Sequence, residues 1–308
     1  MTATDFVAGN LAGPPAETAD GVTIATYDLG GDGPLLVLAH ATGFHGRVWL
    51  PVAAHLRDRY HCIAFDARGH GQSGKAPGGH YDWNGFGLDV LAVVAAATTA
   101  WPGRAGGPDG ADWARPRAVG HSCGGAAVLL AEEAAPGTFE ALYCYEPVVA
   151  DFDFRAESPS GDPLAAGARR RRPIFASRAA ALSNYAAKAT FAAFDPAALE
   201  AYVEWGFHDL PDGTVVLACD PQDEARIYEQ APYNQAYQHL DQVGCPVTLA
   251  AGGRLAHFGR DVVTAVAARI AGETTVEIDD DLGHFGPLEQ PHRVAASVLA
   301  AFDARCAG

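Results

Sequence analysis

Residues 120–125 read Gly120-His121-Ser122-Cys123-Gly124-Gly125, and this stretch decides the fold class. Residues 116–119 before it are typical of the end of a buried strand, and residues 126–133 after it predict a helix. In a strand–turn–helix context, Gly-x-Ser-x-Gly lifts the serine hydroxyl out of a sheet, and its glycines let the helix approach the strand. Ser122 is therefore a candidate nucleophile. The alternative is that it only caps the helix.

Outward from this turn, apolar runs alternate with helical patterns. The continuous apolar run at residues 35–40 is typical of a strand buried on both faces of a parallel sheet. Further strands are predicted at residues 60–65, 141–147, 246–251 and 275–278, and helical patterns occupy residues 49–56, 83–99, 260–271 and 291–306. Repeated strand–helix units predict an α/β fold with a mainly parallel sheet and helices on both faces.

The alternation stops between residues 148 and 243, where aromatic side chains lie among short helical pieces. We therefore predict a core formed by residues 1–147 and 244–308, and an inserted, mostly helical cap formed by residues 148–243. A chain of 308 residues suits one such α/β domain with an insertion.

The composition excludes some kinds of binding partner and some locations in the cell. The net charge is −16, which argues against binding to nucleic acid or to anionic membranes. No stretch offers 18 uninterrupted apolar residues, and the first 21 residues lack a basic region and a long apolar run, so we expect a cytoplasmic protein without a signal peptide. The six cysteines form no C-x-x-C pair, and we expect them to be reduced and mostly buried.

A serine nucleophile needs a general base, and His284 is the candidate for it. It lies in a glycine-flanked loop between a strand and the last helix, where an α/β sheet places reactive groups. The alternative is a loop histidine that bonds to the backbone. Five further histidines show no metal-ligand spacing, and we expect them to be structural or to line the substrate site. They are His40, His45, His70, His121 and His257. No metal or cofactor is predicted.

A tetrahedral oxyanion needs two backbone donors. The N–H of Cys123, the residue after the nucleophile, is one candidate. The second is the N–H of Thr42, in the loop after the strand that ends at His40. The thiol of Cys123 is not expected to be the nucleophile, because the turn presents Ser122.

Four motifs in this order resemble the α/β-hydrolase fold superfamily. They are residues 40–44, residues 66–73, the turn around Ser122, and Gly283-His284-Phe285 followed by Glu289 and Pro291. The resemblance covers roughly residues 22–147 and 245–306. It implies an eight-stranded sheet and a serine hydrolase with a Ser–acid–His triad. Ala41 stands where the family usually has glycine, and alanine restricts the backbone there.

The acid of the triad departs from the family's usual position. That position follows the strand at residues 247–251, but residues 252–259 contain no carboxylate. We favour Glu146, which ends the strand after the Ser122 helix at the edge where the His284 loop also lands. The alternatives are that Glu146 is structural, that no acid exists, or that the acid is Asp261, Asp279, Asp280 or Asp281.

The favoured function is hydrolysis of a small-molecule ester, lactone or thioester with an apolar acyl part. The same triad can also serve carbon–carbon bond hydrolysis, acyl transfer, cyclisation or lyase chemistry, and a non-catalytic ligand-binding protein is a further alternative. The run Arg169-Arg170-Arg171-Arg172 is either a solvated face or a docking patch for an acidic substrate or partner.

Overall fold

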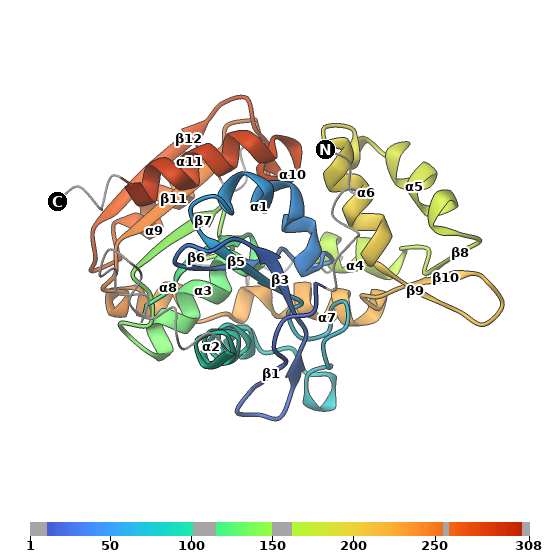
Figure 1. The fold of residues 1–308 in the computed structure, drawn as a ribbon, viewed down its shortest axis with the longest axis horizontal. Helices are drawn as coiled ribbons and strands as arrows, with labels where there is room; N and C mark the ends of the chain where they lie inside the picture. The colour runs from blue at the N-terminus through green and yellow to red at the C-terminus, as the bar shows by residue number, and fades with distance from the viewer. Residues whose placement is uncertain (1–10, 101–114, 150–161, 255–258, 304–308) are drawn as a thin grey trace.

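The computed structural model describes residues 11–100, 115–149, 162–254 and 259–303, which are layered around one central sheet (Figure 1). The sheet has seven strands in the order β12-β11-β7-β6-β4-β5-β3. All neighbours are parallel except β3 and β5. The strands are β3 (Thr26–Gly30), β4 (Leu35–Ala39), β5 (His61–Phe65), β6 (Arg117–His121), β7 (Ala141–Tyr145), β11 (Val247–Gly252) and β12 (Thr274–Asp279).

The main sheet has seven strands in the described part of the chain, rather than the eight that the resemblance implied. The first two strands, β1 (Ala16–Glu17) and β2 (Thr23–Ile24), pair with each other in a separate two-stranded sheet. A tight turn closes this hairpin: Gly21 has a φ of +80° and donates its N–H to Thr18 O. At the outer edge of the main sheet, β3 pairs with Ala12 through an isolated antiparallel bridge at Tyr27.

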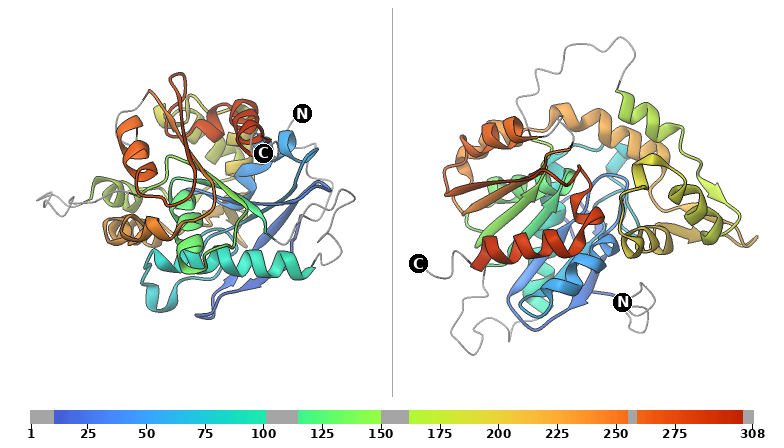
Figure 2. Two further views of the ribbon diagram at one scale, coloured as in Figure 1. Left: turned by 90° about the vertical axis from the view of Figure 1, so that its left-hand side faces the viewer. Right: turned by 90° about the horizontal axis from the view of Figure 1, so that it is seen from above.

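Helices cover both faces of the sheet (Figures 1 and 2). Along β4, Leu36 and Leu38 point into one apolar core, and Val37 and Ala39 point into the other. This alternation explains the continuous apolar run, because both faces of the strand are buried. The first core is shared with α1 (Leu50–Leu56) and α11 (Pro291–Asp303), and the second with α2 (Asn84–Ala100), α3 (Cys123–Ala134) and α9 (Arg260–Ala267).

The segment 162–243, called the middle segment below, lies between β7 and β11 in the chain and holds short helices with a small antiparallel sheet, β8-β10-β9. Its elements are α4 (Pro163–Arg169), β8 (Ile174–Phe175), α5 (Arg178–Ala186), α6 (Pro196–Trp205), β9 (Phe207–Asp209), β10 (Val215–Leu217), α7 (Pro221–Gln230) and α8 (Ala236–His239). Three of its helices begin with an aspartate that caps the helix, followed by a proline in the first turn.

Short elements complete the described chain. The four-residue helix α10 (Gly286–Glu289) precedes α11. Single 3₁₀ turns lie at Gly46–Trp49, Pro77–Gly79, Ala189–Phe191, Ala231–Tyr233 and Leu240–Gln242. None of the helices in the described residues is long and apolar enough to span a membrane.

Candidate active site

Ser122 lies in a sharp turn between β6 and α3, with φ at 56° and ψ at −116°. Its N–H donates to Tyr145 O on the neighbouring strand at 2.9 Å. A side chain on Gly120 would collide with Gly124 O, and a side chain on Gly124 would collide with Ala39 O. The two glycines therefore allow α3 to pack directly on the sheet edge below the serine.

His284 and Glu146 lie side by side, with His284 Nδ1 at 2.6 Å from Glu146 Oε2. Glu146 follows β7 in a left-handed turn with φ at 42°, and it is only 1% exposed. Its other oxygen, Oε1, accepts the N–H of Gly252 at 2.9 Å. Because a carboxylate only accepts hydrogen bonds, the proton of a neutral His284 lies on Nδ1, so Nε2 is the unprotonated nitrogen that can act as a base.

Two further hydrogen bonds hold the loop that carries His284. His121 Nε2 donates to His284 O at 2.7 Å, and Tyr145 Oη donates to Gly283 O at 2.8 Å. Burial lowers the pKa of His121 well below its usual value, so its ring is neutral and donates from Nε2. The last residues of β6 and of the neighbouring strand β7 thus fix the backbone of the His284 loop.

The two candidate oxyanion donors lie next to each other. The hydroxyl of Thr42 lies close enough to the thiol of Cys123 to favour the thiolate and lower its pKa, an effect smaller than that of burial. Within the described ranges, no acceptor is found for the N–H of either residue. Burial raises the pKa of the Cys123 thiol to about 12, so the thiol stays protonated and is a poor nucleophile. The backbone of Cys123, rather than its side chain, is the group that the turn can offer to a substrate.

Ala41 fits the loop without backbone strain. In the described part of the chain, Ser122 and Glu146 are the non-glycine residues with positive φ. Ala41 therefore adopts a conformation open to any residue, and its methyl group is 4% exposed in the core shared with Phe44. The departure from the family's usual glycine does not distort the loop.

The other carboxylates considered for the acid lie elsewhere. Asp261 is exposed in the first turn of α9, and Asp280 is exposed after β12. Asp279 and Asp281 both pair with Arg293, at 2.7 Å and 3.2 Å. Of the five candidate carboxylates, the structure brings Glu146 to His284.

The four consecutive arginines do not form one patch, because Arg171 turns inward. Its side chain is 15% exposed, pairs with Glu224, and donates to Tyr185 Oη at 3.1 Å and Tyr202 Oη at 2.6 Å. Glu224 Oε1 lies 2.7 Å from the position that a Cβ on Gly43 would take. This cluster therefore packs against the loop of Thr42. Sequence reasoning missed Glu224 and Tyr202, since no local pattern separates a buried acid or tyrosine on these helices from an exposed one.

The neighbouring arginines of the run are exposed. Arg169 pairs with Glu229 at 2.7 Å, and Arg170 and Arg172 lie at the surface. Of the remaining histidines, His45 bonds through Nε2 to Tyr202 O at 3.2 Å, and His257 lies outside the described residues. No cluster of three or more His, Cys, Asp or Glu side chains in those residues could hold a metal ion.

Residues 36–297 match the model of the alpha/beta hydrolase family. The chain belongs to this family. The seven-stranded sheet, the turn at Ser122 and the histidine loop after β12 are the parts of the alpha/beta hydrolase fold that surround the candidate site.

The chain is also similar to individual proteins of this fold. It is 35% identical over 63 residues to 3-oxoadipate enol-lactonase 2 of Acinetobacter baylyi, which covers 20% of this chain and 23% of that relative. The structure of E-2-(acetamidomethylene)succinate hydrolase superposes with a TM-score of 0.75 at 18% identity, over 94% of this chain and 98% of that one. The enol-lactonase of Burkholderia xenovorans LB400 gives a TM-score of 0.68 at 18% identity, over 94% and 100% of the two chains.

Proposed function

We propose that this alpha/beta hydrolase cleaves carboxylic esters or lactones through a Ser122–His284–Glu146 triad. The observation that carries the proposal is the 2.6 Å contact between His284 Nδ1 and the buried Glu146 carboxylate, beside the strained turn of Ser122. The names of two relatives, both enol-lactonases, support a cyclic or linear ester as the substrate.

In the proposed mechanism, Ser122 Oγ attacks the carbonyl carbon while His284 Nε2 takes the hydroxyl proton. Glu146 holds the Nδ1 proton and stabilises the imidazolium ion that forms. The N–H groups of Cys123 and Thr42 stabilise the oxyanion. His284 then protonates the leaving oxygen, and a water molecule activated by the same ring releases the acyl group from Ser122.

The surroundings of His284 favour an apolar acyl group. Phe285, the next residue, packs its ring 5.7 Å from Phe44 and 5.3 Å from Phe194. Phe194 comes from the middle segment, so an aromatic wall from two parts of the chain lies beside the base. We therefore propose that residues 148–243 form the cap that shapes the acyl pocket.

The surface arginines and the cysteines extend this proposal to partners and to the cellular compartment. We propose a small-molecule substrate, and we propose that any acidic substrate or partner meets the exposed Arg170 and Arg172, because the charges of Arg169 and Arg171 are already paired with Glu229 and Glu224. The five cysteines in the described residues are buried thiols outside any disulfide, as suits the reducing environment of the cytoplasm.

A serine-directed fluorophosphonate and p-nitrophenyl acetate test the proposed chemistry. We expect the wild-type protein to be labelled and to hydrolyse the ester, and Ser122→Ala to lose labelling and roughly 10⁴-fold or more of kcat. Ser183→Ala is the matched control, because Ser183 is exposed on α5 and bonds to Ala179 O. Undiminished hydrolysis by Ser122→Ala would refute the covalent mechanism, and incorporation of heavy oxygen from water into the product separates hydrolysis from acyl transfer.

A further inference from the structure

We propose that His40 and His70 are positioning residues that set the direction of the Thr42 N–H by holding the peptide groups on both sides of it. This inference rests on the proposed function, in which Thr42 donates to the oxyanion. Neither ring is part of the triad, and both are almost completely buried, at 3% and 1% exposure.

His40 holds the peptide group before Thr42. Its Nδ1 lies 2.8 Å from Ala41 O, and its Nε2 accepts the N–H of Ala67 at 2.9 Å. A backbone N–H can only donate, so Nε2 carries no proton and the ring proton lies on Nδ1. Nδ1 therefore donates to Ala41 O. The chemistry of the two partners fixes the tautomer of this ring.

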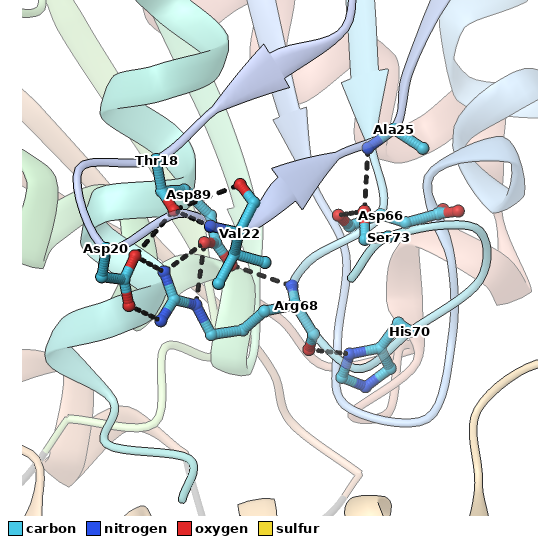
Figure 3. Close-up of polar contacts among 9 residues, drawn as sticks. All are labelled: Thr18, Asp20, Val22, Ala25, Asp66, Arg68, His70, Ser73 and Asp89. Atoms are coloured by element: carbon cyan, nitrogen blue, oxygen red, sulfur yellow. Dashed lines mark hydrogen bonds and ion pairs between the residues drawn. The ribbon is translucent and has the colours of Figure 1, made fainter. Parts of the chain in front are cut away.

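His70 holds the peptide group after Thr42. Its Nε2 accepts the N–H of Gly43 at 3.0 Å, so its ring proton also lies on Nδ1, which donates to Arg68 O at 3.1 Å (Figure 3). Gly43 has a φ of +81°, a conformation that glycine adopts without a steric penalty. The rings of His40 and His70 meet edge to face, with their centroids 5.0 Å apart.

The turn that carries His70 is itself rigidly held. Arg68 donates through Nε to Asp89 at 2.8 Å and through Nη1 to Asp20 at 2.7 Å, and its own N–H donates to Asp89 (Figure 3). In the same turn, Ser73 Oγ donates to Asp66 O at 2.5 Å. The carbonyl that orients His70 therefore belongs to a fixed part of the core, and the histidine transmits that position to Gly43.

Peptide geometry links these contacts to the oxyanion donor. The Ala41 C=O and the Thr42 N–H belong to one planar trans peptide group, so they point in opposite directions. Ala41 O accepts from both His40 Nδ1 and the N–H of Phe44, at 2.8 Å and 3.2 Å. These two bonds fix the direction of the Ala41 carbonyl, and the Thr42 N–H therefore points in the opposite direction. A hydrogen bond to the carbonyl also polarises the amide and strengthens its N–H as a donor.

Both rings keep this arrangement over a wide pH range. Burial lowers the pKa of each to about 3. The hydrogen bonds to Ala41 O and Arg68 O partly oppose the effect of burial on the pKa of His40 and His70, respectively. Protonation would set Nε2–H against a backbone N–H in each case, so the neutral form is the one that holds the loop.

Substitution by asparagine and glutamine tests the proposal at both positions. The amide nitrogen of asparagine occupies the place of Nδ1, and the amide oxygen of glutamine can occupy the place of Nε2. At position 40 the critical atom is Nδ1, so His40→Asn retains the bond to Ala41 O and His40→Gln loses it. At position 70 the critical atom is Nε2, so His70→Gln retains the acceptor for Gly43 and His70→Asn loses it.

The readouts are the second-order rate of fluorophosphonate labelling of Ser122 and the kcat and KM for p-nitrophenyl acetate. We expect His40→Gln and His70→Asn to lower the labelling rate and kcat by roughly 10- to 100-fold with little change in KM. His40→Asn and His70→Gln should stay within a few-fold of the wild type. Melting curves show which of the four variants are folded. If the two variants at one position do not both fold, the comparison of the two variants at the other position tests the proposal.

The crossed pattern separates positioning from a general structural role. A purely structural histidine would favour the same substitution at both positions, or change only the melting temperature, and either result would overturn the proposal. If the wild type is labelled and all four folded variants react equally fast, the positioning role is wrong while the proposed function stands. If the wild type itself is not labelled, the proposed function is refuted, and the positioning role that rests on it is refuted as well.

Discussion

Glu146 combines three features that are energetically unfavourable in a folded protein. Together they orient the imidazole ring of His284. Its backbone has a φ of 42°, its carboxylate is 1% exposed, and its charge lies at the edge of a hydrophobic sheet. Two donors, His284 Nδ1 and the N–H of Gly252, compensate the carboxylate at 2.6 Å and 2.9 Å. A buried acid held in this way fixes both the tautomer and the direction of its histidine.

Replacing Glu146 by glutamine tests this role. The amide keeps the shape of the side chain, but it removes the charge and lets the imidazole take the wrong tautomer, so we expect kcat for p-nitrophenyl acetate to fall by about 10³- to 10⁴-fold. Asp261→Asn is the matched control, because Asp261 occupies the position nearest to the usual acid and is exposed. A large loss of kcat in Asp261→Asn, together with an active Glu146→Gln, would show that the acid is Asp261 on α9.

At the residue scale, the sequence could nominate the site but not complete it. The turn at Ser122 and the loop at His284 follow from local patterns, because glycines mark the positions where the backbone must turn or approach closely. The acid could not be decided this way, since Glu146, Asp279, Asp280 and Asp281 all lie at or just after the end of a strand. The contact of Glu146 with His284 and the pairing of Asp279 and Asp281 with Arg293 separate these candidates, and both depend on tertiary packing.

At the scale of elements, the helices of the middle segment depend on their first residues. Asp162, Asp195 and Asp220 each accept the N–H of the residue two positions later and precede a proline. Aspartate at the N-cap and proline at the first helical position are both favourable. These helices are short, so tertiary packing and capping, rather than helix propensity, keep them folded. The cap of α7 has a further effect, because this helix carries Glu224 to Gly43.

We expect Asp220→Ala to lower the free energy of unfolding by about 1 kcal/mol, because one N–H at the start of α7 loses its acceptor. Asp220→Asn keeps a side-chain oxygen at the cap and should lose only a few tenths of a kcal/mol. Urea denaturation followed by circular dichroism measures both. Equal losses in the two variants would contradict capping by the side-chain oxygen and would point to the charge of Asp220 instead.

At the scale of the whole molecule, the alternation of apolar runs and helical patterns predicted the layers, and the family match and the seven-stranded sheet confirm that architecture. The main sheet has seven strands in the described residues rather than eight, because residues 16–24 form a separate hairpin and Ala12 makes only an isolated bridge to Tyr27 at the edge of the sheet. The small sheet β8-β10-β9 was also missed, since strands of two or three residues are too short to show a period. Long elements buried on both faces were therefore predictable, and short pairings were not.

One buried acid in the packed core makes the stability of the molecule depend on pH. Glu133 lies on α3, is 8% exposed, and its Oε1 has no hydrogen-bond partner among the described residues. Burial, with a smaller effect from the charge of Asp241, raises the pKa of Glu133 from 4.5 to about 8. Its neighbour Glu132 is also buried, but its carboxylate accepts the N–H groups of Gly137 and Phe139, at 2.7 Å and 3.0 Å.

The sign of the pH effect follows from the raised pKa of Glu133. The folded protein binds this proton more tightly than the unfolded chain, so the contribution of Glu133 to stability is full below pH 4.5 and is lost as the pH rises towards 8. Glu133→Gln cannot ionise, and we expect it to be more stable than the wild type by up to about 4 kcal/mol at pH 8 and by less than about 1 kcal/mol at pH 5. Glu132→Gln removes a paired acceptor and should be destabilised at both values. Urea unfolding at the two pH values measures all three proteins, and an unchanged pH slope in Glu133→Gln would show that other groups carry the dependence.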